Sequence, residues 1–253
     1  MTRISGILAD FGLAWRLLTV LPLPFIPEDV ERPAGQAAAY YPLVGLILGL
    51  LLAGADWLLV RLLPAGLAAA LLLAGWAALT GLLHLDGLMD SCDGLLPPRE
   101  PARRLEIMKD SRVGAFGVIG AALLLLIKFN ALAALPAPQR LPFLAASPTL
   151  ARWAITWAMV RYPLARTQGV SVFFSSGLGW GQAMLATIIA ALAALSFSGG
   201  WGLLLLGLAW LAATLIARLA MARIAGLTGD VYGAICEVTE VVLLSAGVIL
   251  GNL

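Results

Sequence analysis

The sequence predicts an all-α fold: a polytopic bundle of helices embedded in a membrane. Of its 253 residues 61% are hydrophobic and only 12% are charged, whereas soluble domains carry about 25% charged residues. The apolar residues gather in runs long enough to cross a bilayer, for which a helix needs about 20 residues. These runs take up most of the chain, so we expect a single membrane domain over residues 1–253.

We expect about seven spans, preceded by a helix at the membrane interface. Ile4 to Val20 predicts that helix, because Asp10 and Arg16 interrupt its apolar run and Leu21-Pro22-Leu23-Pro24 ends it. A polar linker from Pro27 to Gln36 follows. The predicted spans are Ala37–Leu63 (with Gly45 and Gly49 spaced for close helix approach), Leu67–Leu85, Val113–Leu135, Phe143–Val160, Gln182–Phe197, Trp201–Met221 and Gly233–Leu250.

The charged residues favour one orientation of this bundle. Seven spans place three connections on the same side as the N-terminal helix, and that side holds most of the lysine and arginine: Leu95–Arg112, Arg161–Gly181 and Arg223–Tyr232. The opposite side holds little besides Arg61 and Arg140. The positive-inside rule therefore predicts that the three connections face the cytoplasm.

An acidic motif ends the second predicted span, His84-Leu85-Asp86-Gly87-Leu88-Met89-Asp90-Ser91-Cys92-Asp93-Gly94. On a helix its three aspartates fall within roughly a 60° arc. Three anions on one face repel one another where the medium screens charge poorly, so a cation should lie against them. Hard oxygen ligands suit Mg²⁺ or Mn²⁺. The alternative is a solvated helix end with ordinary surface acids.

His84 is the only histidine in the sequence. On a regular helix its side chain points away from the aspartate face. A role beside the carboxylates would therefore require a break in the helix near Gly87.

A second motif combines cations with an acid, Met108-Lys109-Asp110-Ser111-Arg112-Val113-Gly114-Ala115-Phe116-Gly117. Lys109 and Arg112 can neutralise phosphate oxygens, and Arg does so in a bidentate fashion. The glycines begin a helix, where free amides and the macrodipole favour anions. The alternative is a set of positive-inside anchors.

A third group of acids enters the last predicted span. Asp230 and Glu237 are seven residues apart and share one helical face, and ionisable residues inside a span favour function. The alternative is pairing with Arg218 or Arg223. Arg152 and Arg166 are further candidates for phosphate contacts, or anchors of the topology.

Together these residues predict metal-assisted phosphoryl transfer. Acids would hold Mg²⁺, cations would clamp a diphosphate, and an incoming hydroxyl would attack in line. The net charge of +2 is too small to suggest nucleic acid as a partner. The residues alone indicate a membrane transferase with a diphosphate substrate.

The two motifs around Asp86 and Asp110 closely resemble the cobalamin (5'-phosphate) synthase family, also called adenosylcobinamide-GDP ribazoletransferases. The resemblance extends in order to Leu21-Pro22-Leu23-Pro24, Tyr41-Pro42-Leu43-Val44-Gly45 and Gly226-Leu227-Thr228-Gly229-Asp230-Val231-Tyr232-Gly233-Ala234. It implies a multi-pass enzyme of the bacterial inner (plasma) membrane with a cytoplasmic active site. That enzyme would join adenosylcobinamide-GDP to α-ribazole or its 5'-phosphate with Mg²⁺ and release GMP.

With this resemblance, we expect four acids to bind the metal: Asp86, Asp90, Asp93 and Asp110. Of these, Asp86, Asp90 and Asp110 are also expected to be catalytic. Substrate binding is expected of His84, Lys109, Arg112, Arg152, Arg166, Asp230 and Glu237. The partners are the two substrates and the lipid bilayer, and the sequence leaves a homo-oligomer open. The alternatives are another Mg²⁺-dependent membrane transferase, of the CDP-alcohol phosphotransferase or prenyltransferase type, and an ion-coupled transporter.

Overall fold

The structure is a computed structural model that describes residues 3–23 and 33–252. Over these residues its regular elements are all helices, without β-strands, which confirms the predicted all-α class. The helices are α1 (Arg3–Leu18), the 3₁₀ helix η1 (Ala34–Tyr40), α2 (Tyr41–Leu62), α3 (Ala65–Leu79), α4 (Leu83–Leu95), α5 (Pro101–Ile107), α6 (Ala115–Ala134), α7 (Ala137–Arg161), α8 (Val170–Ser175), α9 (Trp180–Ser198), α10 (Trp201–Ile224) and α11 (Gly229–Leu250). Most of the predicted linker Pro27–Gln36 lies outside the described residues.

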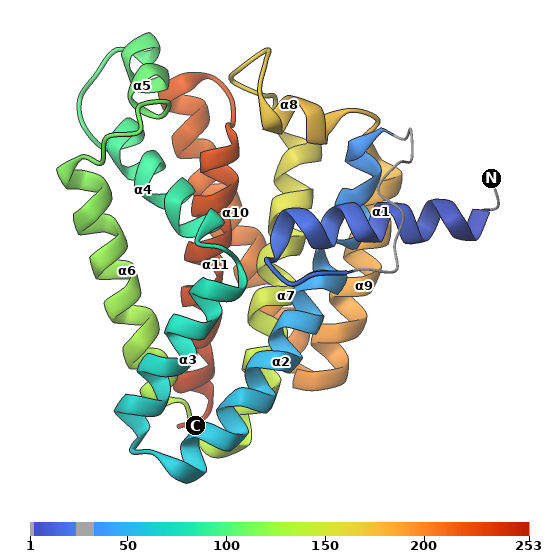
Figure 1. The fold of residues 1–253 in the computed structure, drawn as a ribbon, viewed down its shortest axis with the longest axis vertical. Coiled ribbons are helices and arrows are strands. Elements are labelled where there is room, and N and C mark those ends of the chain that lie inside the picture. The colour runs from blue at the N-terminus through green and yellow to red at the C-terminus, as the bar shows by residue number, and fades with distance from the viewer. Residues whose placement is uncertain (1–2, 24–32, 253) are drawn as a thin grey trace.

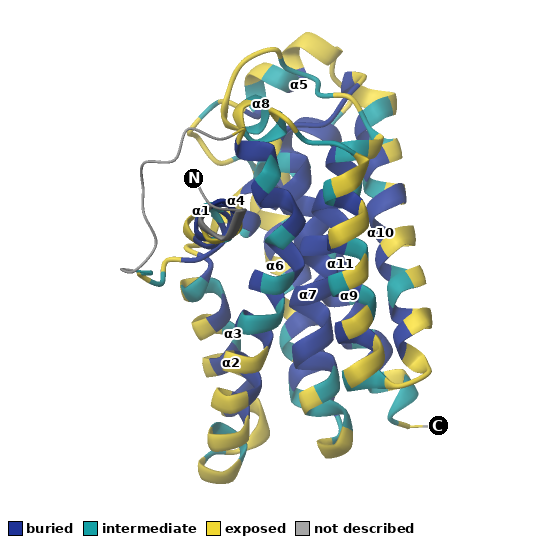
Figure 2. Cartoon of the chain, turned by 90° about the vertical axis from the view of Figure 1, so that its right-hand side faces the viewer, coloured by how far each residue is buried: buried dark blue, intermediate teal, exposed yellow. Residues whose placement is uncertain are grey.

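The long helices form one bundle, and α1 lies crosswise beside it (Figure 1). In the described part of the chain, α2 with η1, α6, α9, α10 and α11 are long and apolar enough to cross a membrane, and α3 with α4 would add a broken span. Helix outer faces carry exposed leucines, among them Leu203, Leu211 and Leu215 of α10, while their inner faces are buried (Figure 2). An apolar surface of this kind suits a lipid environment, so the chain is a polytopic membrane bundle.

Helix α7 is not among these apolar helices, although it is 25 residues long. It packs against α2, α9, α10 and α11 and is buried along most of its length. A helix enclosed by other helices needs no lipid-compatible face and can carry Arg152. The count of seven spans therefore stays a prediction.

The contact between α2 and α7 depends on two glycines. A Cβ atom at Gly45 or Gly49 would meet the α7 backbone at Pro148 and Leu144 respectively. The close approach predicted from the glycine spacing is confirmed.

The predicted second span, Leu67–Leu85, is wrong in its extent. Helix α3 ends at Leu79, the chain bends by 89°, and α4 begins at Leu83. Gly81 and Leu82 take left-handed conformations, with φ of 59° and 62°, and the Thr80 hydroxyl donates back to the carbonyls of Trp76 and Ala77. The bend gives the acidic motif a short helix of its own.

Candidate active site

The acidic motif meets the last helix where α4 crosses α11. A Cβ atom at Gly87 would lie 2.9 Å from the carbonyl oxygen of Asp230, and one at Gly233 would lie 2.8 Å from that of His84. Only glycine lets the two backbones come so close. The crossing places the first turn of α11 against the face of α4 that carries the motif.

This crossing gathers three of the predicted acids and one predicted cation. Asp90 interacts electrostatically with Asp230 and Asp86, and Asp230 also interacts with Asp86. Arg166, from the loop before α8, has Nη1 3.5 Å from Oδ2 of Asp230. The Thr228 hydroxyl accepts from the amide of Val231 and so caps α11. We call Asp86, Asp90, Asp230 and Arg166 the acidic cluster.

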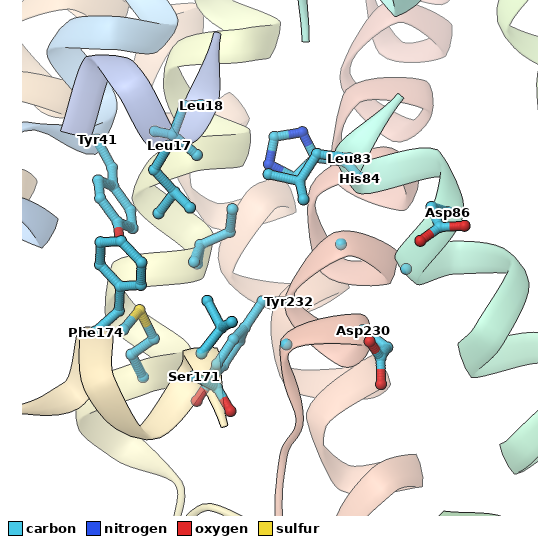
Figure 3. A pocket seen from close by; sticks show the side chains of 16 residues that line it. Leu17, Leu18, Tyr41, Leu83, His84, Asp86, Ser171, Phe174, Asp230 and Tyr232 are labelled. Carbon is cyan, nitrogen blue, oxygen red and sulfur yellow. The ribbon is translucent and has the colours of Figure 1, made fainter. Parts of the chain in front are cut away.

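A cavity of about 280 Å³ opens beside the acidic cluster. Asp86 and Asp230 line one side of it, and side chains from α1, α2, α7 and α8 line the other (Figure 3). His84 and Tyr232 also line it. A ligand in this cavity would therefore meet carboxylates on one side and mostly apolar groups on the other.

Asp93 has other partners. Its carboxylate is buried and accepts hydrogen bonds from the amides of Gly114 and Gly117, both at 2.8 Å, at the N-terminus of α6. A Cβ atom at either glycine would collide with this carboxylate. The sequence predicted that these amides bind an anion, and the anion they hold here is Asp93 itself.

Lys109, Asp110 and Arg112 of the second motif lie on the connection between α5 and α6. Arg112 donates to both carboxylate oxygens of Asp110, and these hydrogen bonds lower the pKa of Asp110 to about 2. Lys109 is exposed. None of the three lines the cavity, so the structure does not bring Asp110 together with the acidic cluster.

Glu237 and Arg152 belong to a buried network deeper in the bundle. Lys128 Nζ lies 3.0 Å from Oε2 of Glu237 and also pairs with Glu240, which in turn pairs with Arg152. All four side chains are buried. The expected alternative, that Glu237 pairs with Arg218 or Arg223, is wrong, because two cations from α6 and α7 reach it and Glu240 inside the bundle.

His84 connects this network to the cavity. Its Nδ1 lies 3.4 Å from Nη2 of Arg152. The helix break expected near Gly87 lies instead at residues 80–82, and α4 is continuous through Gly87. His84 is buried on the side away from the exposed Asp86, as a regular helix requires.

A formed metal cage is absent from the described residues, where no three histidine, cysteine or acidic side chains lie close enough to hold an ion. The Asp93 carboxylate accepts from two backbone amides, and the Asp110 carboxylate pairs with Arg112. The donor set that fits Mg²⁺ is the carboxylates of the acidic cluster, because Mg²⁺ is usually held by one or two carboxylates together with waters and substrate phosphates.

Sequence reasoning did not find three contributors to the site. Arg104 is buried and donates to the carbonyls of Gly94 and Leu95, which closes the end of α4. Lys128 is buried and pairs with Glu237 and Glu240. Tyr232 carried no signal beyond its place beside Asp230.

The fold and the site define a class: a polytopic all-α membrane protein with a carboxylate-lined cavity between its helices. Within that class, the family model described as cobalamin-5-phosphate synthase matches residues 10–248, and the chain belongs to this family.

Curated relatives agree with that membership. The chain is 38% identical to an adenosylcobinamide-GDP ribazoletransferase of Roseiflexus sp. (strain RS-1), over 95% of this chain and 89% of the relative. It is 41% identical to one of Desulforamulus reducens, over 92% and 93% of the two chains, and 39% identical to one of Geotalea daltonii, over 96% and 98%. No solved structure matches. The CDP-alcohol phosphotransferase, prenyltransferase and transporter alternatives are not favoured by these matches.

Proposed function

We propose that this chain joins adenosylcobinamide-GDP to α-ribazole or its 5'-phosphate and releases GMP. The acceptor's hydroxyl oxygen bonds to the phosphorus attached to cobinamide, the bond from that phosphorus to the bridging oxygen breaks, and GMP leaves with that oxygen. The product is adenosylcobalamin or its 5'-phosphate. The names of the relatives, at about 40% identity over nearly the whole chain, support this reaction.

The proposed mechanism is based on the geometry of the α4–α11 crossing. It holds Asp86, Asp90 and Asp230 within electrostatic range of one another beside a cavity, with Arg166 against them. Like charges this close are costly unless a cation joins them. We propose that one or two of these carboxylates hold Mg²⁺ together with waters and substrate phosphates, and the bound ion would neutralise charge on the diphosphate oxygens.

The chain's own residues would perform the remaining tasks. A carboxylate of the cluster takes the proton that the acceptor hydroxyl loses, since acids at hydrogen-bond reach of a substrate act in this way. Arg166 holds phosphate oxygens that approach Asp230. Lys109 and Arg112 remain candidates for the nucleotide side of the diphosphate, from their exposed loop.

We propose further that the protein lies in the bacterial inner membrane with this site facing the cytoplasm. The helices α5 and α8 and the connections beside them gather at one end of the bundle (Figure 1). These connections carry most of the cations outside the helices, so the positive-inside rule favours that end as cytoplasmic.

One assay tests the reaction. Purified protein is mixed with adenosylcobinamide-GDP, α-ribazole and Mg²⁺, and GMP is measured. We expect GMP only when both substrates are present, and we expect a chelator to stop its release until Mg²⁺ is restored in excess. Folded protein that releases no GMP would refute the proposal, and unchanged release in the chelator would refute the metal.

A further inference from the structure

The cavity has an apolar end that phosphate chemistry does not use. Its walls there are Leu17 and Leu18 from α1, Ile155 and Met159 from α7, and Phe174 from α8. Asp86 and Asp230 lie on the opposite side (Figure 3). The shape and chemistry of the cavity therefore suit a molecule with an apolar part joined to a part that reaches the acidic cluster.

The size of the cavity limits which substrate can place a ring system in it. At about 280 Å³, it is just below the range of roughly 300–1,000 Å³ typical of sites that enclose drug-sized ligands. It has room for a base and part of its sugar, but not for a corrin macrocycle. Guanine carries several donors and acceptors, which would lose their partners among leucine, isoleucine and methionine side chains.

Two polar groups in residues of the wall have unused hydrogen-bonding capacity. Arginine can only donate, so the contact with Arg152 makes Nδ1 of His84 an acceptor and leaves the proton on Nε2. Within the described residues no hydrogen bond involves that Nε2 atom, and the buried hydroxyl of Tyr232 has no partner either. Both residues line the cavity.

We propose that this end of the cavity is the subsite for the acceptor's aromatic base, and that the Nε2–H of His84 donates to a ring nitrogen of that base. The fitting ligand is an apolar two-ring base with an unsubstituted accepting nitrogen, as in the benzimidazole of α-ribazole. Arg152, held in place by Glu240, fixes the tautomer of His84. This inference rests on the proposed function. It names the part of the acceptor substrate, its aromatic base, that enters the apolar end of the cavity.

The first test changes the apolar wall and separates the two substrates. Phe174→Ala should raise KM for α-ribazole by about tenfold or more, because it removes a ring from the buried contact surface. KM for adenosylcobinamide-GDP should stay unchanged. The matched control is Phe173→Ala, since Phe173 is the neighbouring ring on the same short helix but is 58% exposed and lies outside the cavity.

The second test concerns His84. The amide nitrogen of glutamine can reach the place of Nε2, whereas that of asparagine reaches only the place of Nδ1. His84→Gln should therefore keep KM for α-ribazole near the wild-type value, and His84→Asn should raise it. Because His84 is the only histidine, ¹⁵N-histidine labelling with a histidine-free tag gives NMR signals from this ring alone. We expect the Nε2–H tautomer, with the Nε2 signal shifting when α-ribazole is added.

The outcomes distinguish this inference from the reaction itself. If the wild type releases GMP but Phe174→Ala leaves KM for α-ribazole unchanged, or Phe173→Ala raises it equally, the subsite is refuted while the function stands. A proton found on Nδ1 would also overturn the assignment of His84. If no GMP is released, the proposed function fails, and equilibrium dialysis of α-ribazole against wild type and Phe174→Ala still decides whether the cavity binds the base.

Discussion

Asp90 and Asp93 are three residues apart on α4, yet their carboxylates meet different surroundings. Asp90 is half-buried among other acids, with Asp230 and Asp86 as its electrostatic neighbours. Asp93 is buried against two backbone amides of α6. Asp93 thus docks α6 onto α4, whereas Asp90 lies among the acids proposed to act in the reaction.

Asp93→Asn is expected to act on stability. An amide group can accept from only one of the two glycine N–H groups and presents its own NH₂ to the other, so we expect a loss of about 1–3 kcal/mol in the free energy of unfolding. The measurement is thermal unfolding in detergent, together with activity per folded molecule. A variant that unfolds like the wild type but has lost all turnover would show instead that Asp93 takes part in the reaction.

The pattern of the sequence could identify the motif but not this division of roles. The spacing of Asp86, Asp90 and Asp93 correctly placed them on a single helix. The partners of Asp93 lie 21 and 24 residues further along the chain, and only the docking of α6 onto α4 brings them there. Tertiary contacts of this kind leave no local signal.

At the level of elements, the α4–α11 crossing decides the geometry of the candidate site. The two helices touch through Gly87 and Gly233, and the side chains of Asp86 and Asp230 flank that contact. The distance between the acids therefore depends on the absence of a Cβ atom.

Gly87→Ala tests this dependence. The added Cβ would lie 2.9 Å from the Asp230 carbonyl oxygen, which forces the helices apart. Overpacking of this kind typically costs about 1–3 kcal/mol, and we expect GMP release to fall steeply because the carboxylates separate. Gly75→Ala on α3 is the control, since a Cβ there meets no atom within 4 Å. Equal activity of both variants would show that the crossing does not set the site.

The buried network joins three elements, with Lys128 on α6, Arg152 on α7 and Glu240 on α11. Lys128 stands 112 residues from Glu240. The sequence predicts neither of these ion pairs, because no local pattern shows which helices are neighbours in the bundle.

Lys128→Met is expected to destabilise the bundle by about 3–5 kcal/mol, because it leaves two buried glutamates with one cation. Adding Glu237→Gln to Lys128→Met should recover part of that loss. Arg103→Ala is the control, since its pair with Glu106 is exposed on both sides and such pairs contribute little. The measurement is the midpoint of thermal unfolding in detergent. A Lys128→Met protein as stable as Arg103→Ala would refute the role of the network.

At the scale of the whole molecule, the composition predicts the fold class. An apolar chain with few charges had to be a membrane bundle, and the helices and their apolar outer faces agree. The break at residues 80–82 was not predicted, because Leu82 takes a left-handed conformation that leucine rarely adopts. The span predicted over Phe143–Val160 is helical, as part of α7, but α7 begins earlier, at Ala137, and is not among the helices apolar enough to cross a membrane.

The orientation of the molecule can be measured in intact cells. With Cys92 and Cys236 replaced by alanine, Lys109→Cys should be labelled by a membrane-impermeant maleimide only after the cells are opened. Gly66→Cys, exposed at the other end of the bundle, should be labelled from outside. The reverse pattern would place the site on the outer face of the membrane.

In the proposed function, the acids at the α4–α11 crossing promote transfer of the cobinamide-linked phosphoryl group from GMP to the ribazole hydroxyl. The most direct measurement is the amount of both products, GMP and the ribazole-linked corrinoid, formed by wild type and by Asp90→Asn at equal amounts of folded protein. We predict equal quantities of the two products from the wild type, and a loss of on the order of 100-fold or more from the variant with its expression unchanged. GMP without the joined corrinoid, or full turnover by Asp90→Asn, would contradict the account.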